Sequence, residues 1–158
     1  MLIEEIELQL KNGLNIEDIL AKYDWHKFES VIKEIFQENN YHTKQNFRFK
    51  TERRYEIDVI ATMNNKIFCI DCKWWGRGKY KAAGLRKATV SQEGRVKEFE
   101  KFLKNNVIAK DMLKIPSKYT IYPLLVTLHE ENVIKEGNTF IVPVWKLNKF
   151  VTEAENYF

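Results

Sequence analysis

The chain has 158 residues, of which 44% are hydrophobic and 13% aromatic, and this is enough apolar material for the core of one domain. That composition excludes a mostly disordered chain. No apolar run is long enough to span a membrane, and no signal peptide is visible. Together with the two cysteines, this predicts a cytoplasmic protein with no membrane partner.

The net charge of +4 is unevenly distributed. Residues 1–24 hold two basic and six acidic side chains, a net charge of −4. Residues 73–97 hold eight basic side chains against Glu93 alone, a net charge of +7. A concentrated basic stretch is typical of a surface that binds a polyanion such as nucleic acid, although a solvated loop and helix face would give the same count.

Two short helices are predicted in the first 23 residues. Apolar residues recur at helical spacing on either side of Gly13, and Asn15 with Asp18 resembles a capping box. We predict that residues 1–23 form a helical appendage for packing or dimerisation, and that residues 24–158 form the main domain. A helix-turn-helix DNA reader is the other interpretation, but its acidic side chains would repel DNA phosphates.

The main domain begins with a helix predicted at residues 25–40, with Asp24 as its N-cap. A polar arm at residues 42–54, expected to form a hairpin, leads to an alternating strand at residues 55–62. A further strand at residues 66–75 is apolar on both faces and is therefore expected at the centre of a sheet.

The second half of the domain continues the alternation of helices and strands. A basic loop is predicted at residues 76–88, followed by a long helix at residues 90–105. Strands are predicted at residues 119–128 and 139–147, and a proline in each indicates a bulge or an edge position. The predicted fold class is therefore α/β, a mixed β-sheet flanked by helices.

Three polar side chains stand in the two apolar central strands. Asp71 and Lys73 point to the same face of their strand because side chains alternate. The short turn at Asn64-Asn65 makes the two strands neighbours, so that Asp58 can lie near Asp71 if the register allows. Two close carboxylates repel each other, and a hard cation such as Mg²⁺ relieves that repulsion. A simple Asp71–Lys73 ion pair is the alternative, but it leaves Asp58 unexplained.

Glu29 has the same unusual placement on the helix before these strands. It lies three residues before Ile32 and seven before Phe36, and therefore on the apolar stripe of the helix. A glutamate at the edge of that stripe could also reach solvent or pair with a lysine. Its company with the acids of the two strands favours a functional role.

Three short runs resemble the PD-(D/E)xK nuclease superfamily, and within it the archaeal Holliday junction resolvases and the Mrr-like restriction endonucleases. They contain a helical acid, an aspartate on one strand, and an acid-x-lysine on the next, with 12 residues between the two aspartates. The resemblance extends over roughly residues 25–102, about half the chain. The runs are Phe28-Glu29, Glu56-Ile57-Asp58 and Ile70-Asp71-Cys72-Lys73.

The resemblance implies a restriction-endonuclease-like fold with an αβββαβ core, Mg²⁺ (or Mn²⁺) as cofactor, and DNA as partner. Asp58 and Asp71 are then the implied metal ligands, together with the backbone carbonyl of Cys72. Lys73 is implied to position or activate the attacking water, and Glu29 to ligate the metal directly or through water. Asp71 stands where the nearest relatives more often have glutamate, which leaves the ligand geometry open.

Gln92 has two interpretations. Some members of the superfamily place a catalytic glutamine on the helix that follows the lysine strand, and the position of Gln92 before Val96 and Phe99 turns it toward the sheet. The pattern Thr89-x-x-Gln92 also matches a capping box at the start of that helix.

Two groups of basic residues are the predicted DNA contacts. One lies on the polar arm, where basic residues are interleaved with Phe47 and Phe49, and an exposed hairpin without function would look the same. The other lies in the basic loop. The two groups are Lys44, Arg48, Lys50, Arg53 and Arg54, and Arg77, Lys79, Lys81, Arg86 and Lys87.

Some neighbouring features resemble chemistry without the spacing that chemistry needs. Cys69 and Cys72 are an odd number of positions apart on a strand, so their thiols face opposite sides and neither chelate a metal nor form a disulfide easily. Trp74 is expected to pack in the core, whereas Trp75 could pack or stack on a base.

The sequence therefore predicts a metal-dependent DNA endonuclease. A small chain without an obvious target-recognition domain favours a structure-specific enzyme such as a junction resolvase. Cutting both strands needs two sites, so a homodimer is expected. The alternatives are an Mrr-like restriction-type nuclease and a DNA-binding module that keeps the fold without cutting.

Overall fold

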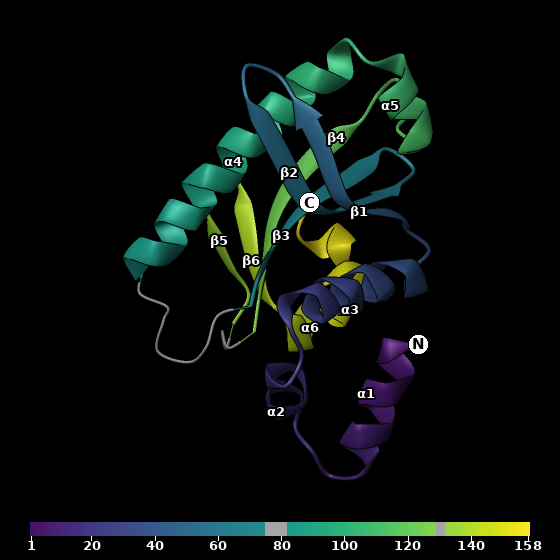
Figure 1. Cartoon of the computed structure of the whole chain (residues 1–158), viewed down its shortest axis with the longest axis vertical. Coiled ribbons are helices and arrows are strands. Elements are labelled where there is room, and N and C mark those ends of the chain that lie inside the picture. Colours follow the sequence, from purple (N-terminus) through teal and green to yellow (C-terminus); the bar gives the residue numbers. More distant parts are fainter. Residues whose placement is uncertain (75–81, 129–131) are drawn as a thin grey trace.

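A six-stranded sheet runs through the part of the chain that the computed structural model describes, residues 1–74, 82–128 and 132–158 (Figure 1). Its strand order is β1-β2-β3-β4-β6-β5. The strands are β1 (His42–Lys50), β2 (Arg54–Met63), β3 (Lys66–Lys73), β4 (Thr120–Thr127), β5 (Ile134–Glu136) and β6 (Thr139–Pro143).

The β3 strand lies inside this sheet, as its apolar sequence predicted. It pairs antiparallel with β2 and parallel with β4, which makes the sheet mixed. Alternation sends Phe68 and Ile70 into the core on one face, while Ile67 and Cys69 enter the core on the other. A strand with helices on both sides cannot carry exposed polar residues, so its run of apolar side chains is what the position requires.

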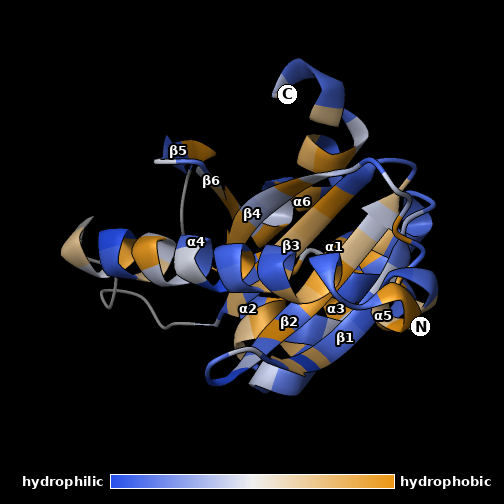
Figure 2. Ribbon diagram, turned by 90° about the horizontal axis from the view of Figure 1, so that it is seen from above, coloured by the Kyte–Doolittle hydropathy of each residue, from blue (hydrophilic) through white to orange (hydrophobic). Residues whose placement is uncertain are grey.

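Helices cover both faces of the sheet, which confirms the predicted α/β class. On one face α3 and α6 pack over β2, β3 and β4, and on the other α4 packs over the same strands and continues across β6. Hydrophobic and hydrophilic residues alternate along α4, as a helix with one buried stripe requires (Figure 2). The helices are α1 (Leu2–Lys11), α2 (Ile16–Ala21), α3 (Trp25–Glu38), α4 (Ala82–Lys104), α5 (Val107–Met112) and α6 (Val144–Thr152), followed by a 3-10 turn at Ala154–Asn156.

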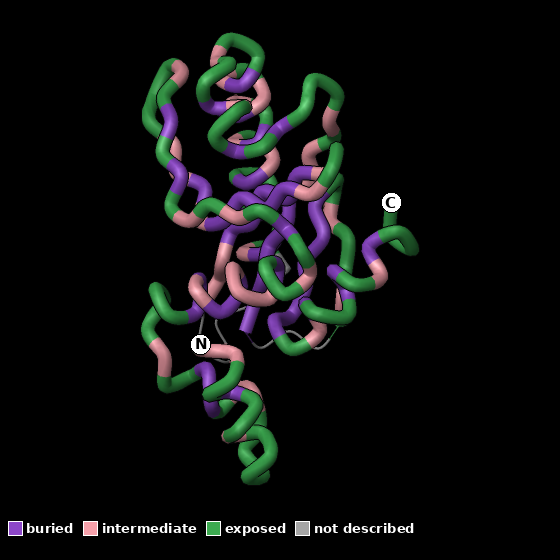
Figure 3. The backbone as a smooth tube through the Cα atoms, turned by 90° about the vertical axis from the view of Figure 1, so that its right-hand side faces the viewer, coloured by how far each residue is buried: buried purple, intermediate pink, exposed green. Residues whose placement is uncertain are grey.

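The two predicted N-terminal helices form and pack beside α3. The Asn15 side chain accepts a hydrogen bond from the Asp18 backbone and caps α2, as its sequence predicted. Ile19 and Leu20 belong to the same core as α3 and the sheet. Exposed residues predominate along this end of the tube (Figure 3). None of the helices in the described ranges is long and apolar enough to cross a membrane.

The fold corrects the predicted start of the long helix. The helix begins at Ala82 and not at residue 90, because Leu85 and Ala88 bury against Leu125 and Ile141 on the sheet. Arg86 and Lys87 therefore lie on a helix and not in a loop. Packing on the sheet outweighs the polar appearance of this segment.

The predicted strand at residues 139–147 is half wrong. Strand β6 ends at Pro143, which is also the N-cap of α6. From Val144 the buried residues follow helical spacing, with Leu147, Phe150 and Val151 facing the core. The short elements α5 and β5 were also not predicted.

The predicted edge position of the strand at residues 119–128 is wrong as well. Strand β4 lies between β3 and β6, and β5 is the edge strand next to β6. The proline is accommodated because the pairing of β4 with β6 starts at Leu124, one residue after Pro123.

Candidate active site

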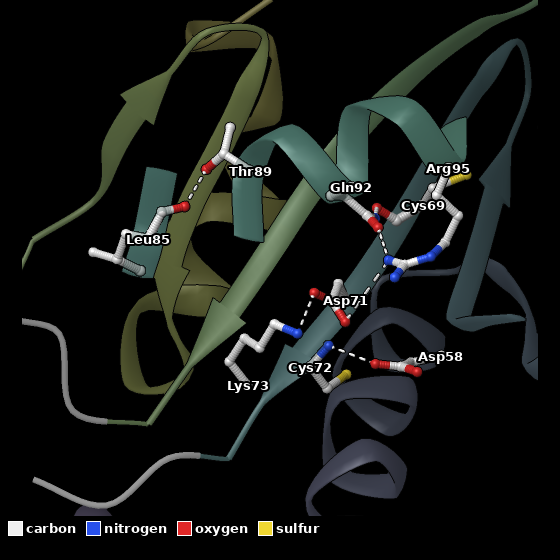
Figure 4. A network of polar contacts seen from close by, with 9 residues as sticks. All are labelled: Asp58, Cys69, Asp71, Cys72, Lys73, Leu85, Thr89, Gln92 and Arg95. Carbon is white, nitrogen blue, oxygen red and sulfur yellow. Dashed lines mark hydrogen bonds and ion pairs between the residues drawn. The ribbon is translucent and has the colours of Figure 1, made fainter. Parts of the chain in front are cut away.

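Asp58 and Asp71 meet because of the register of β2 and β3. The ladder between the two strands runs from Met63↔Lys66 to Val59↔Ile70, and Asp58 and Asp71 are the next residues beyond its last pair. The backbone N–H of Cys72 donates a hydrogen bond to Asp58 Oδ2 at 2.8 Å (Figure 4). The strands therefore hold the first carboxyl group against the second strand, as the sequence pattern required.

The regular pairing of the sheet is interrupted at Asp58. The ladder between β1 and β2 has Gln45↔Val59 and Phe47↔Ile57 but no pair between them. Asn46, which stands between those two positions, has a φ of 53°, a left-handed conformation that asparagine adopts more readily than most residues. On both sides of Asp58, the backbone is thus released from the sheet at the point where the carboxyl group is needed.

Asp71 is buried, and its carboxylate is paired with a lysine from the same strand. Lys73 Nζ lies 2.8 Å from Asp71 Oδ2, so the two side chains share one face of β3 as predicted. This face is the one that α4 covers, since Cys69 on the same side packs against α4 residues. An ion pair with this little solvent around it is held by specific geometry and not by surface attraction.

The surroundings of Asp58 change its protonation. Burial, and next to it the negative charge of Asp71, raise the pKa of Asp58 to about 7, although the hydrogen bond from Cys72 opposes the rise. Burial is also the main cause of the raised pKa of Glu29. Near neutral pH, the Asp58 carboxyl group is therefore partly protonated unless a bound cation displaces the proton.

Glu29 lies on the buried side of α3, as its place on the apolar stripe predicted. It is 4% exposed, between Phe28 and the other core residues of that helix. The Gln45 amide donates a hydrogen bond to Glu29 Oε2 at 3.5 Å. Its negative charge contributes to the raised pKa of Asp58, so Glu29 lies near the two aspartates.

Gln92 faces the sheet, and the capping-box interpretation is wrong. It stands in the interior of α4, and its fully buried amide donates to the Cys69 carbonyl oxygen at 2.8 Å. Thr89 also stands inside the helix, where its hydroxyl donates to the Leu85 carbonyl oxygen at 2.9 Å. The glutamine thus ties α4 to β3 two residues before Asp71.

Arg95 is a site residue that the sequence reasoning missed. Its guanidinium donates to the Gln92 amide oxygen and lies 4.0 Å from Asp71 Oδ1 (Figure 4). The signal was its spacing, since a residue three positions after Gln92 lies on the same side of a helix. In the sequence it counted only as one of the basic residues of the +7 segment.

The cysteines and Trp74 behave as predicted. Cys69 is buried in the core on the α4 side, whereas Cys72 packs against the core on the α3 side. Burial raises the pKa of both thiols, so neither is a reactive thiolate at neutral pH. The Trp74 indole packs against the core and donates to the Leu20 carbonyl oxygen at 3.1 Å. Trp75 lies outside the described residues.

The predicted DNA contacts on the β1–β2 hairpin are exposed, with one correction. Phe47 and Phe49 are buried against Phe99 and Phe102 of α4, so they hold the hairpin in place and do not present rings to a ligand. The hairpin carries a shallow hollow of about 700 Å³ that includes Arg54. The exposed basic residues there are Lys44, Arg48, Lys50, Arg53 and Arg54.

Some of these cations already have partners. Arg48 Nε lies 2.6 Å from Glu56 Oε2, and the Arg53 guanidinium lies 4.8 Å from the centre of the Tyr55 ring. From the second predicted group, Arg86 and Lys87 are exposed on α4. Arg77, Lys79 and Lys81 lie outside the described residues.

The donor set fits a hard divalent cation through a pair of carboxylates. Asp58 and Asp71 supply oxygen ligands from adjacent strands, and the Cys72 carbonyl is a further oxygen on the same segment. Within residues 1–74, 82–128 and 132–158, no three His, Cys, Asp or Glu side chains come together closely enough to hold a metal. Glu29 therefore stands near the pair without completing a three-carboxylate cluster.

Comparison with known proteins points to a family. Residues 20–118 match the Mrr_cat family model, described as restriction endonuclease, and this range contains all the candidate catalytic residues. A protein of Archaeoglobus fulgidus, described as uncharacterized, is 28% identical over 134 residues, which is 84% of this chain and 93% of that protein.

Two solved structures are similar at lower identity. The protein of unknown function AF1548 has a TM-score of 0.41 and 16% identity, over 78% of this chain and 54% of that chain. Protein VC1899 from Vibrio cholerae has a TM-score of 0.37 and 18% identity, over 83% of this chain and 32% of that chain. The chain thus spans about half of the first structure and about a third of the second.

We expect Asp58→Asn to stabilise the metal-free protein more at pH 8 than at pH 5. The folded pKa of Asp58 is about 7, above the value of about 3.9 in an unfolded chain. The stability contributed by its protonated form is therefore complete below pH ~4 and is lost as the pH rises through 7. Asparagine keeps the neutral form at every pH. Thermal unfolding in EDTA at both pH values measures the difference.

The matched control for this stability experiment is Asp111→Asn on α5, where the aspartate is exposed. Its effect on the melting temperature should be small and equal at the two pH values. An Asp58→Asn effect that does not change between pH 5 and pH 8 would contradict the buried, proton-sharing carboxyl pair.

Proposed function

We propose, from the premise that this chain belongs to the Mrr_cat restriction endonuclease family, that it hydrolyses phosphodiester bonds of DNA with a bound divalent metal. Membership of the family makes the chain a nuclease domain. The observation that supports the metal-dependent mechanism is the pairing of β2 with β3, which brings Asp58 and Asp71 together just beyond the last pair of the ladder, with Lys73 Nζ 2.8 Å from the Asp71 carboxylate.

Asp58 and Asp71, with the Cys72 carbonyl, are the proposed ligands of Mg²⁺ or Mn²⁺. The ionised form of Asp58, whose pKa is raised by burial and by the nearby charge of Asp71, is unfavourable without a counter-charge, and a bound cation removes that cost. When bound, such a metal supplies polarisation of the phosphate and a water of lowered pKa. Glu29 is proposed to hold the metal's hydration shell from the α3 side, because it lies near the pair but outside it.

Lys73 is the proposed residue for the attacking water and the developing charge. Lys73 Nζ lies at ion-pair distance, 2.8 Å, from Asp71 Oδ2, and therefore close to the proposed metal ligands. We therefore propose that Lys73 orients water and stabilises negative charge on the phosphate oxygens, with a smaller part as a base. Gln92 is proposed as a positioning residue of this site, which sets the distance between α4 and β3.

The proposed substrate is branched DNA, such as a four-way junction. The residues that the structure describes form one sheet with its helices, and none of them builds a separate module for reading bases. The exposed cations of the β1–β2 hairpin suit contacts with phosphates, which give affinity without sequence information. The family description favours a second candidate, a restriction-type nuclease acting on duplex or modified duplex DNA.

The expected result for Asp58→Asn is loss of DNA cleavage by several orders of magnitude, because a metal ligand is replaced by a neutral amide. Labelled four-way junction and matched linear duplex are incubated with wild type and variant, in Mg²⁺ and in EDTA. Asp111→Asn should cut like wild type. Metal-dependent cutting of the junction alone supports the branched substrate, and equal cutting of duplex supports the restriction-type nuclease.

The alternative of a non-cleaving module has its own outcome in this experiment. Tight binding of either DNA, or of methylated duplex, without cutting by wild type would overturn the proposed hydrolysis. Unchanged cutting by Asp58→Asn would overturn the site but leave the nuclease.

Binding of Mg²⁺ should tighten between pH 6 and pH 8. The metal must displace the proton from Asp58, whose pKa is about 7, so fewer protons compete at the higher pH. Isothermal titration calorimetry of the protein without DNA measures the affinity. The number of protons released is obtained from the change of the observed binding enthalpy between buffers of different ionisation enthalpy. In Asp58→Asn the pH dependence should disappear along with most of the affinity. Equal affinity at both pH values in wild type would contradict a metal at this pair.

A homodimer is proposed because symmetric cutting of two strands requires two active sites, and the described residues contain one candidate site. Light scattering on the eluting protein should give twice the mass of the 18.9 kDa chain. A monomeric mass in the presence of junction DNA would contradict this arrangement.

A further inference from the structure

The Arg95 guanidinium lies beside the Asp71 carboxylate and is held by Gln92. Its NH1 group donates to the Gln92 amide oxygen, and the other end of that amide donates to the Cys69 carbonyl oxygen at 2.8 Å. Both functional atoms of a completely buried glutamine are thus used, one on the strand and one on the arginine. Such an amide cannot turn without losing two buried hydrogen bonds, so it holds the guanidinium in one orientation.

Asp71 is not the main anchor of this arginine. The distance from Arg95 NH1 to Asp71 Oδ1 is 4.0 Å, whereas Lys73 approaches the other carboxylate oxygen to 2.8 Å. The two cations stand on different oxygens of the same carboxylate (Figure 4). Because the lysine already neutralises Asp71, the arginine carries a positive charge beyond what that ion pair needs.

Arg95 also has unused donors. A guanidinium has five N–H groups, and here NH1 makes the hydrogen bond to Gln92. To the residues that the structure describes, Nε and NH2 donate no hydrogen bond. The side chain is 24% exposed, so an anion from solvent can reach it. A fork of free N–H groups held rigidly beside a hydrolytic site is suited to a phosphate oxygen.

We propose that Arg95 is a catalytic residue that binds a non-bridging oxygen of the DNA phosphate being cut, and that Gln92 positions it. The assignment rests on the proposed nuclease function and adds a substrate contact to it. The charge on the phosphate oxygens grows during hydrolysis, and a donor fixed beforehand stabilises that charge without reorganisation. The glutamine then has a second task besides joining α4 to β3.

Arg95→Met tests the contact through DNA binding as well as through cleavage. Binding to labelled junction and duplex is measured in EDTA at several salt concentrations. Each phosphate contact contributes about 0.9 to the slope of log affinity against log salt, so the slope should fall by about that amount. Single-turnover cleavage with Mg²⁺ should fall about 100-fold or more. Affinity for Mg²⁺ without DNA should not weaken, because removing a nearby cation favours a second one.

Arg95→Lys is the conservative variant, and it should keep the salt slope while losing cleavage, since an ammonium lacks the planar fork. Lys149→Met on α6, on the opposite face of the sheet, is the matched control and should behave as wild type. Melting temperatures of all variants identify any loss of folding, and Arg95→Lys keeps the test decisive if Arg95→Met unfolds.

Two results would overturn the assignment. One is a wild-type salt slope in Arg95→Met with weakened Mg²⁺ affinity, which would mean that the arginine acts through Asp71 alone. The other is full cleavage by both Arg95 variants while wild type cuts DNA, in which case the nuclease stands and the phosphate contact does not. Wild type that neither binds nor cuts DNA overturns the proposed function itself.

Discussion

Two carboxyl groups are held together in this protein by the hydrogen bonds of a strand pair. The ladder from Met63↔Lys66 to Val59↔Ile70 places Asp58 beside Asp71, although the two negative charges repel each other. The stability of the sheet outweighs their mutual repulsion, since β3 is also paired with β4 on its other side. Burial and the nearby charge of Asp71 raise the pKa of Asp58, and Lys73 and Arg95 both approach the Asp71 carboxylate.

The core and the site use the same strand. On β3, Cys69 and Asp71 both face α4. A core residue and a residue of the candidate site are therefore neighbours on one face of this strand. Gln92 connects the two, because it donates a hydrogen bond to the Cys69 carbonyl oxygen in the core and accepts one from Arg95 in the site. The position of α4 on the sheet therefore sets the geometry of the site, and apolar packing by Phe99 and Leu103 sets the position of α4.

The features that depend on short-range periodicity were predicted well from the sequence. The period of two gave the shared face of Asp71 and Lys73 and the opposite faces of the cysteines, and the helical stripe gave the burial of Glu29. The match to the restriction endonuclease family and the mixed sheet bear out the predicted fold. Long-range packing was not predictable: Leu85 extends α4 only because the sheet offers Leu125, and Arg95 gains its role only when α4 lies across β3.

The origin of the register has an evolutionary consequence. Because the pairing of β2 and β3 is counted from the turn at Asn64 and Asn65, inserting one residue there would move every side chain of β3 to the other face and separate the acids. The turn after Lys50 is different, since the ladder of β1 with β2 can be lengthened outward while Asp58 stays where it is. A chain of this fold can thus vary in length at the tip of the β1–β2 hairpin without moving Asp58, but it is constrained at the β2–β3 turn.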